Sequence, residues 1–391
     1  MLPALARAQE WAAAGVEVTL VDPQRHLYYS GMVPEYLGGV YDASAVRVDL
    51  AARAHEQGAR FVQAPAAAIR PHESVVQTAN GTTHPYDVLA IDVGSVNPSV
   101  PAGAIATKPI HRVRALAEQL ETTLSSPTNR LRLVMVGGGA AGTEVALNVT
   151  GRFAGAGRLG DLELTVIEQA DRLLPAFPSG MSATAARRLR RRGTAIRTGT
   201  AVTAVDPVDA DNIRVHTDRG SLLDADAVLW ATGTVGPSLL HDSPLPTDDR
   251  GFVRVTRPLR VGSHPRIFAA GDCATVDGLD LARVGVHAVK QGPTLRTNLD
   301  RTLRSLRDNQ KTPPAEALQP FRPYPVTPLI LSTGAADGLW TAGPLWAAHP
   351  WLLRLKHWID RRWIRQYAPE HWQHASWRNL LGAESAAGAA R

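Results

Sequence analysis

A glycine-rich turn between a strand and a helix constrains the fold of this chain more than any other feature. Residues 131–136 read LRLVMV, an apolar run typical of a buried strand, and residues 137–142 read GGGAAG before a helical stretch. In this G-x-G-x-x-G spacing Gly137 permits a tight turn, Gly139 lets the backbone approach a pyrophosphate, and Gly142 lets the helix pack on the sheet. The turn predicts a dinucleotide-binding βαβ unit.

An acidic residue follows at the end of the next strand. Residues 162–167 read LELTVI, and Glu168 comes directly after them. A carboxylate at this place accepts a hydrogen bond from a ribose 2′-hydroxyl and repels a 2′-phosphate, so NADH is expected in preference to NADPH. The nearby Arg172 leaves NADPH open, and a solvated strand-end carboxylate is the structural alternative for Glu168.

The chain opens with what resembles the second half of another such unit. Residues 2–14 are expected to form a helix, and residues 16–21 (VEVTLV) a strand that ends at Asp22. In a complete unit Asp22 would bind the ribose of a second dinucleotide. Short β-branched runs alternate with helical segments along the chain, which predicts an α/β fold with parallel sheets.

Composition narrows the class of protein. With 391 residues, 44% of them hydrophobic, two or three domains are expected. Cys273 is the single cysteine, which excludes an internal disulfide and a redox-active cysteine pair within one chain. No apolar run is long enough to span a bilayer and no signal peptide precedes the first strand, so a cytoplasmic protein, soluble or peripheral, is expected.

The net charge of +6 does not by itself point to a partner. The densest basic run is expected to be a solvated helix face, and no nucleic acid partner is expected. The run consists of Arg187, Arg188, Arg190, Arg191 and Arg192.

Three further segments resemble the pyridine nucleotide-disulfide reductase superfamily. Residues 268–273 (FAAGDC) resemble its second FAD motif, and residues 81–95 and 228–233 resemble its strands entering and leaving the nicotinamide domain. Separated segments are also similar to flavoproteins related to type II NADH dehydrogenases, including those associated with selenophosphate synthetase. These segments are 29–34 (YSGMVP), 90–95 (AIDVGS), 108–110 (KPI), 285–293 (GVHAVKQGP) and 351–363 (WLLRLKHWIDRRW).

The resemblance implies two Rossmann-like domains, the NAD domain being inserted in the FAD domain. The expected parts are 1–107 (FAD domain, first part), 108–239 (NAD(P)H domain), 240–307 (FAD domain, second part) and 308–391 (linker and C-terminal extension). Beyond the glycine turn and Glu168, it implies cofactor contacts from Asp22, Gly94, Gly233, Gly271 and Asp272. The first strand and FAD glycine loop of the pattern are missing, so a late-assigned or truncated start is expected, with poor FAD binding as the alternative.

Candidate catalytic residues also follow from the resemblance. Glu144 resembles the acidic residue near the nicotinamide–flavin contact, although the helix dipole would favour a glutamate there anyway. A helix is expected from Val284 to Leu303, with His287 and Gln291 on one face. Related dehydrogenases border their quinone pocket with this helix, so Gln291 is expected to line the acceptor site and His287 to donate a proton, a packed histidine being the alternative.

The C-terminal extension contains a candidate interfacial helix. Segment 308–320 is expected to be a linker, and residues 384–391 to be disordered. Trp351, Leu352, Leu355, Trp358, Ile359 and Trp363 share one arc of a helical wheel, and Arg354, His357, Arg361 and Arg365 lie opposite. This pattern predicts attachment to the inner face of a membrane, while burial against the protein or in a homodimer remains open.

The leading hypothesis is a peripheral FAD-dependent dehydrogenase that passes electrons from NADH to a quinone. The alternatives are a soluble NAD(P)H reductase with a protein or small-molecule acceptor, and a nucleotide-binding accessory protein without turnover. Cys273 is expected to be a small buried residue, which argues against sulfide:quinone and disulfide reductase chemistry.

Overall fold

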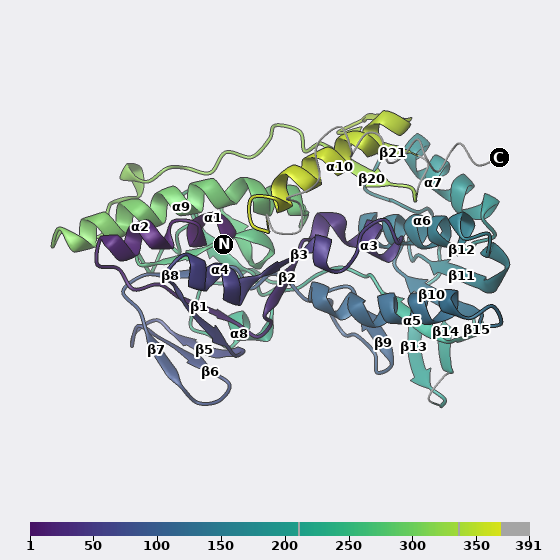
Figure 1. Ribbon diagram of the computed structural model, residues 1–391, viewed down its shortest axis with the longest axis horizontal. Coiled ribbons are helices and arrows are strands. Elements are labelled where there is room, and N and C mark those ends of the chain that lie inside the picture. Colours follow the sequence, from purple (N-terminus) through teal and green to yellow (C-terminus); the bar gives the residue numbers. More distant parts are fainter. Residues whose placement is uncertain (210–211, 335–336, 369–391) are drawn as a thin grey trace.

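The computed structural model describes residues 1–209, 212–334 and 337–368, and residues 384–391 and the tryptophans beyond 368 lie outside this part. Figure 1 shows two lobes side by side: the N-terminal helices and α9 (Gly285–Arg307) in one, and a parallel sheet with α6 (Ala140–Gly155) in the other. Helix α10 (Pro350–Ile364) runs along the top of the molecule.

The lobe at the right of Figure 1 confirms the predicted unit around the glycine turn. Its five-stranded sheet is parallel, in the order β12-β11-β10-β16-β9, and β10 pairs with β11 along its whole length. The strands are β9 (Ala104–Ala106), β10 (Leu131–Val136), β11 (Leu162–Ile167), β12 (Ala195–Arg197) and β16 (Ala227–Trp230).

Side-chain alternation along β10 explains why both faces of this sheet are covered. Leu133 and Met135 pack against α5 (Arg114–Ser125), α6 and α7 (Ser179–Arg191). Val134 and Val136 face the other way, toward a three-stranded antiparallel sheet. That sheet consists of β13 (Val202–Pro207), β14 (Ile213–Thr217) and β15 (Leu222–Ala225). Each fully buried aliphatic side chain contributes roughly 1.5–3 kcal/mol.

The left lobe contains short parallel strand pairs. Strand β1 (Thr19–Asp22) pairs with β4 (Arg60–Gln63), and β8 (Leu89–Ile91) pairs with β18 (Ile267–Ala269). In the described part of the chain, β1–β4 and β8–β18 form two separate two-stranded sheets. The other elements of this part of the chain are β2 (His26–Tyr28), β3 (Arg47–Asp49), α4 (Leu50–Glu56), β5 (Ala66–Arg70), β6 (Val75–Thr78), β7 (Thr83–Pro85), α8 (Ser238–His241), β17 (Val253–Val255) and β19 (Ala274–Val276). Helix α3 (Val33–Leu37) lies against α6 of the right lobe (Figure 1).

Two expectations about helices need correction. The helix expected over 2–14 is split into α1 (Leu2–Leu5) and α2 (Ala8–Ala13), because the Arg7 N–H bonds to the Ala4 carbonyl only three residues back, at 2.9 Å. The helix expected to end at Leu303 continues through Arg307 as α9. Segment 308–320 contains one short 3₁₀ turn, at Ala315–Ala317, in otherwise irregular backbone, and its role as a linker stays a prediction.

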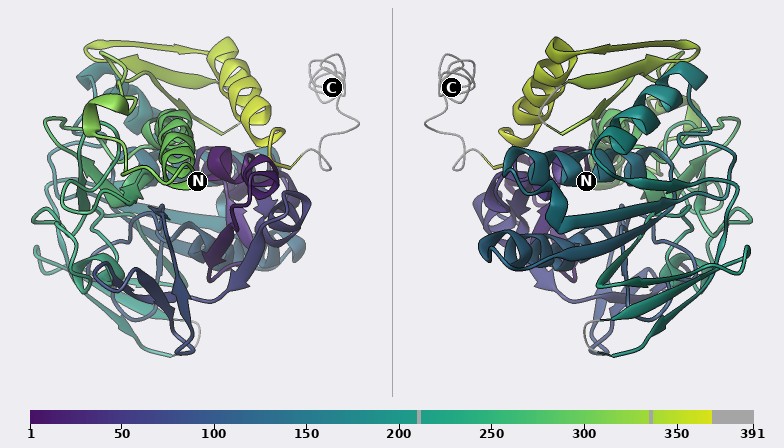
Figure 2. Two further views of the ribbon diagram at one scale, coloured as in Figure 1. Left: turned by 90° about the vertical axis from the view of Figure 1, so that its left-hand side faces the viewer. Right: turned by 90° about the vertical axis from the view of Figure 1, so that its right-hand side faces the viewer.

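The C-terminal unit combines one antiparallel sheet with α10. Its strands are β20 (Leu329–Ser332), β21 (Gly338–Ala342) and β22 (Leu345–His349). Arg188 donates to Asp337 at 2.6 Å, and Arg192 to the Thr333 carbonyl at 2.8 Å. The basic run is therefore only partly a solvated face: Arg187, Arg190 and Arg191 are exposed, whereas Arg188 and Arg192 hold this unit on the right lobe. Figure 2 shows the unit covering one side of the molecule.

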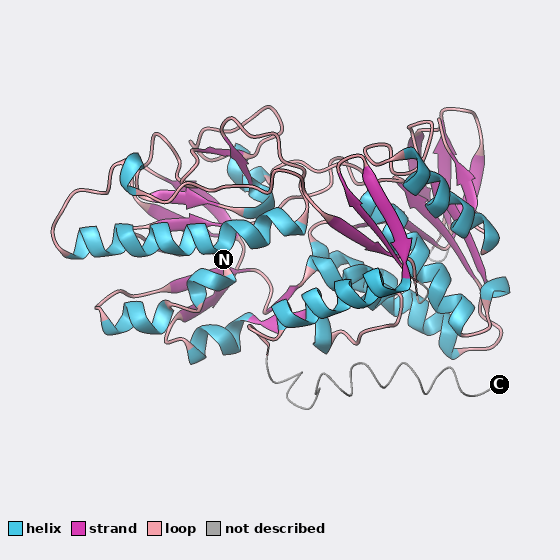
Figure 3. Ribbon diagram, turned by 90° about the horizontal axis from the view of Figure 1, so that it is seen from above, coloured by secondary structure: helices cyan, strands magenta, loops and turns pink. Residues whose placement is uncertain are grey.

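The buried face of α10 differs from the predicted one. Lys356, His357 and Asp360 are buried, whereas Trp351 and Trp358 are 52% and 58% exposed. Half of the predicted apolar arc, Trp351, Trp358 and Ile359, is thus exposed, whereas Leu352 is buried. Lys356 and Asp360 form an ion pair inside the protein. Figure 3 shows α10 beside the helices of the right lobe. No helix in the described part is long and apolar enough to cross a membrane.

Candidate active site

The glycine turn has the geometry that its spacing predicts. Gly137 has a φ of +107°, and a Cβ on it would lie 2.5 Å from the Ala231 carbonyl oxygen. A Cβ on Gly142 would overlap the Gly137 carbonyl oxygen, so α6 can approach the turn only with glycine there. Gly139 has no such neighbour within 4 Å of its Cβ position, which leaves backbone at the start of α6 open to a ligand. The turn fits a pyrophosphate at a helix N-terminus.

Glu168 is fixed beside this turn. Its two carboxylate oxygens accept hydrogen bonds from the backbone N–H groups of Gly138 at 2.5 Å and Ala170 at 2.8 Å. Arg172, which left NADPH open, donates to the carbonyls of Leu174 and Pro175 at 3.1 and 2.7 Å. The negative charge of Glu168 therefore lies at the turn while the Arg172 guanidinium is directed to loop carbonyls, an arrangement that suits an unphosphorylated ribose.

The predicted FAD ligands lie at the carboxyl ends of β1, β8 and β18. Burial raises the pKa of Asp22, whose carboxylate accepts from the Gln24 N–H at 2.7 Å. Gly94 has a φ of +70° and open space at its Cβ position. Asp272 forms an ion pair with Lys108 and accepts from the Ser95 hydroxyl at 3.3 Å. These residues fit the ribose, pyrophosphate and ribityl groups of FAD, and their contacts with the cofactor stay predictions.

Two more glycines flank this region. Gly271 has a φ of +73°, and a Cβ on it would collide with the carboxylate of Asp92, so the turn before Asp272 requires glycine. The Gly233 carbonyl accepts from the Asn97 side-chain amide at 3.2 Å where the chain leaves the right lobe. The sequence singled out Lys108 only as part of the family-like segment 108–110, without a role, and it did not single out Asn97, which carries no recognisable spacing.

Helix α9 brings His287 and Gln291 to this region. The Gln291 side-chain oxygen accepts from the Gly271 N–H at 2.6 Å, so this glutamine orients the Gly-Asp turn. His287 Nε2 lies 3.1 Å from the Thr327 hydroxyl, and its Nδ1 is buried without a hydrogen-bond partner in the described part of the chain. Burial, followed by the positive charge of Lys290, lowers the pKa of His287. Both side chains are buried, and their catalytic roles stay predictions.

Glu144 lies in a different environment from a first-turn glutamate. It is in the second turn of α6, and its Oε1 accepts from the backbone N–H of Ser332 at 2.8 Å. Burial raises the pKa of Glu144 to about 8. The Lys356 ammonium lies 3.9 Å from the same oxygen. Glu144 thus lies beneath the C-terminal unit. Because its side chain is buried, it is not the exposed first-turn carboxylate that the helix dipole alone would explain.

The sequence did not identify the partners around Glu144. Lys356 Nζ lies 2.6 Å from Glu35 and 2.9 Å from Asp360. Lys356 and Asp360 are four residues apart on α10, a spacing that indicates a helical ion pair, but on a helical wheel such a pair is indistinguishable from an exposed one. Glu35 carries no signal, since an acidic residue in the first turn of a helix such as α3 is ordinary.

Cys273 is a buried thiol, in agreement with the sequence. Its Sγ lies 3.1 Å from the Ala270 carbonyl, and burial raises its pKa to about 12. A thiol with this pKa is not a nucleophile at neutral pH. The described residues contain no group of histidine, cysteine and acidic side chains that could hold a metal ion.

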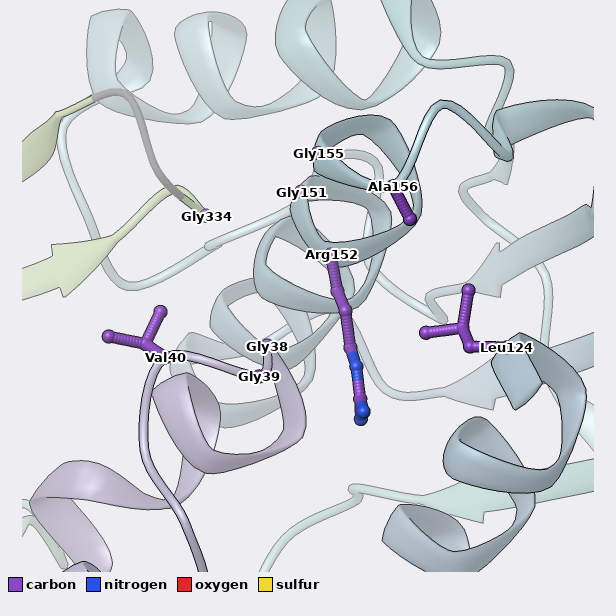
Figure 4. Close-up of a pocket in the computed structure, with 9 residues that line it drawn as sticks. All are labelled: Gly38, Gly39, Val40, Leu124, Gly151, Arg152, Gly155, Ala156 and Gly334. Carbon is purple, nitrogen blue, oxygen red and sulfur yellow. The ribbon is translucent and has the colours of Figure 1, made fainter. Parts of the chain in front are cut away.

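A shallow pocket of about 310 Å³ lies elsewhere, between α3, α6 and the loop after β20 (Figure 4). Its walls are mainly glycines, and the Arg152 side chain extends across it. None of the predicted site residues lines this pocket. At this pocket α6 and the loop after β20 approach each other closely, because a Cβ on Gly151 would lie 2.7 Å from Gly334.

Comparison with known proteins defines the class. The family model for pyridine nucleotide-disulphide oxidoreductases matches residues 3–292, well over half of the chain. The chain therefore belongs to the pyridine nucleotide-disulphide oxidoreductase family. It is an oxidoreductase of the NADH dehydrogenase-like kind, with FAD and NADH as the cofactors that this membership implies.

Individual relatives agree with this class. Demethylphylloquinone reductase of Synechocystis is 25% identical over 72% of this chain and 70% of its own. A type II NADH:quinone oxidoreductase of Staphylococcus epidermidis is 22% identical over 85% and 84%. The fold is similar to NDH2 from Plasmodium falciparum in complex with NADH, with a TM-score of 0.66, 14% identity and coverage of 94% of this chain and 96% of the other. It is also similar to the sulfide:quinone oxidoreductase of Aquifex aeolicus, with a TM-score of 0.69, 14% identity and coverage of 94% and 89%.

Proposed function

We propose that the protein is an FAD-dependent NADH dehydrogenase that passes electrons to a quinone-type acceptor. The observation that carries the proposal is the pair of strand-end sites, one at the glycine turn with Glu168 and one at Gly94 and Asp272. Each lies at the carboxyl edge of parallel strands, which is where dinucleotides bind in this fold class. Two named quinone reductases among the relatives support the acceptor class.

The residues of the chain would position the two cofactors. Glu168 would accept from the ribose of NADH, and the open backbone at Gly139 would receive its pyrophosphate. Asp272, oriented by Lys108 and by the turn that Gln291 holds, would bind the ribityl chain. FAD, when bound, supplies the hydride acceptor and the electron transfer to the second substrate. The N-terminus of α9, near Gly285, is the positive end of the helix dipole, and it would stabilise negative charge on reduced FAD.

Acceptor reduction would take place on the α9 side. Gln291 and His287 lie on one face of this helix, and the unpaired Nδ1 of His287 can accept or donate one proton. His287→Ala is expected to lower turnover with a quinone analogue at least about tenfold while NADH still binds. Steady-state kinetics with NADH and a water-soluble quinone measure this. Equal turnover in both proteins would remove His287 from the mechanism, and no quinone reduction by the wild type would favour a soluble reductase with another acceptor.

The exposed face of α10 suits the surface of an anionic membrane. Trp351, Trp358 and Ile359 are exposed, and Arg354 and Arg362 lie among them. Tryptophans beside arginines are typical of helices that lie in the lipid interface. Trp351→Ser with Trp358→Ser should weaken sedimentation with vesicles of anionic phospholipid, and should leave vesicles of neutral phospholipid as poorly bound as before. Unchanged binding to anionic vesicles would contradict membrane attachment through this face.

A further inference from the structure

A path of polar contacts connects the two proposed cofactor sites. It begins at Asp272, which follows β18 of the left lobe and forms an ion pair with the ammonium of Lys108. Lys108 follows β9 of the right lobe, and the same ammonium donates to the Ser95 hydroxyl at 3.0 Å. The side chains of Lys108 and Asp272 are 21% and 18% exposed, so water screens this pair only in part. The FAD end of the path is therefore a partly buried ion pair between the lobes.

Asn97 continues the path toward the glycine turn. Its side-chain oxygen accepts from the Lys108 backbone N–H at 2.7 Å, and its amide donates to the Thr232 carbonyl at 2.9 Å. Asn97 is only 6% exposed, so water competes little for these hydrogen bonds. The backbone nitrogen of Thr232 lies 3.2 Å from the Cβ position of Gly137, at the turn itself. This path, from Asp272 through Lys108, Asn97 and Thr232 to Gly137, is the Lys108 link.

The Lys108 link crosses the place where the chain passes between the lobes. The segment after β8 leaves the left lobe and the segment after β16 returns to it. Val96 and Val235 pair these two segments through backbone hydrogen bonds of 3.0 and 2.9 Å. Thr107, beside Lys108, donates from its hydroxyl to the Asn97 side-chain oxygen at 3.0 Å. Because these groups are bonded to one another in one arrangement, a displacement of Lys108 would be passed on to the crossover.

Lys108 is the ion-pair partner of Asp272 within the described part of the chain. Asp92, which lies close to Asp272, is paired with the amino group of Met1 at 2.5 Å. Arg283 interacts with Asp272 at longer range, but its guanidinium donates to a backbone carbonyl and to a threonine hydroxyl. Without the Lys108 ammonium, the Asp272 carboxylate would lack its direct partner beside the place proposed for an anionic dinucleotide.

We propose that the Lys108 link couples the two cofactor sites, so that FAD bound in the left lobe raises the affinity of the right lobe for NADH. This rests on the proposed function, in which Asp272 binds FAD and the glycine turn binds NADH. FAD fixes the Asp272 carboxylate and with it Lys108, and Asn97 and Thr232 then hold the glycine turn in its binding arrangement. The entropy of ordering the link is lost once, so the second cofactor meets a site that is already ordered. By linkage, the NADH site when filled raises the affinity for FAD by the same factor.

Binding of ADP-ribose to the full-length protein, with and without FAD, tests this coupling. ADP-ribose has the ribose and pyrophosphate groups of NADH but no nicotinamide, so it cannot reduce FAD and lacks the ring that would contact the flavin. Calorimetric titration should show that wild type binds ADP-ribose at least about fivefold more tightly with FAD than without it. In Lys108→Met, at saturating FAD, this ratio should fall to about one. Lys311→Met, at an exposed lysine in segment 308–320, is the control and should keep the wild-type ratio.

The other outcomes separate the coupling from the cofactor sites. Should Lys108→Met fail to fold, Lys108→Met combined with Asp272→Asn removes the same ion pair without leaving a carboxylate unpaired. A wild type that binds both ligands, with equal affinity for ADP-ribose whether or not FAD is present, would overturn the coupling. A wild-type ratio in the Lys108 variants would overturn it as well. A wild type that binds no FAD, or no ADP-ribose, would instead contradict the cofactor sites of the proposed function, and the coupling with them.

Discussion

Gly137, Gly139 and Gly142 belong to one turn but are required for different reasons. Gly137 needs a positive φ, Gly142 needs the space that the Gly137 carbonyl fills, and Gly139 is free of packing demands. At the residue scale, stability and ligand binding are therefore separable within one motif. The sequence spacing predicts the motif but does not separate these two contributions.

Alanine at two of these positions should separate them. Gly142→Ala is expected to destabilise the protein by about 1–3 kcal/mol, because α6 must shift away from the turn. Gly139→Ala should unfold at the wild-type temperature but bind NADH at least about tenfold more weakly, a loss of about 1.4 kcal/mol, because its methyl group points into the open space. Thermal unfolding and NADH titration measure the two effects. Equal losses of stability in both variants would show that Gly139, like Gly142, is required for packing.

The buried carboxyl of Glu144 should make stability depend on pH. Burial raises its pKa to about 8, whereas in the unfolded chain the pKa is about 4.3. Between these values the folded protein holds more protons than the unfolded chain, so this carboxyl's stabilisation is complete below about pH 4 and is lost as the pH rises through about 8. Glu144→Gln should show a smaller fall in the free energy of unfolding between about pH 5 and 8, by up to about 3–4 kcal/mol, since one proton contributes roughly 1.4 kcal/mol for each pH unit. Urea unfolding at several pH values measures this, and the same pH dependence of the free energy of unfolding in both proteins would contradict it.

At the scale of elements, α10 shows where sequence reasoning stops. A helical wheel correctly places Trp351 and Trp358 on the same face of the helix, but it assumes that charged side chains face water. Lys356 and Asp360 instead face inward, because Glu35 and Glu144 come from distant parts of the chain. The strands at 131–136 and 162–167, in contrast, were predictable, since their signal is local and their neighbours follow in the chain.

The attachment of the C-terminal unit depends on Arg192 at the end of α7. Its guanidinium donates to the carbonyls of Leu147 at 2.7 Å, Thr333 at 2.8 Å and Gly334 at 3.1 Å. Arg192→Ala should destabilise the protein by about 2 kcal/mol and speed hydrogen exchange in β20 and β21. The exposed neighbour Arg191→Ala is the control and should change neither. Equal exchange in all three proteins would show that the unit is held by other contacts.

At the scale of the whole molecule, sequence motifs predicted two candidate dinucleotide sites. They did not predict the ion-pair contacts among α3, α6 and α10. The proposed NADH site is built from a turn and the end of the strand that follows it, and Asp272 lies in a short motif of its own, so Gly139, Glu168 and Asp272 were recognisable as candidates although Gly94 and Asp272 are far apart in the chain. The ion pairs around Lys356 join three helices far apart in sequence, and Glu35 alone is an ordinary helical glutamate. Domain boundaries at 107 and 239 stay predictions.

The most direct test of hydride transfer from NADH to FAD is the visible absorption spectrum of the purified protein with FAD, before and after NADH is added without oxygen. The absorption bands of oxidised flavin should bleach on addition of NADH and return when a quinone analogue is supplied. Protein that binds no FAD, or bound flavin that keeps its oxidised spectrum in excess NADH, would contradict the central claim that this chain transfers hydride from NADH to FAD.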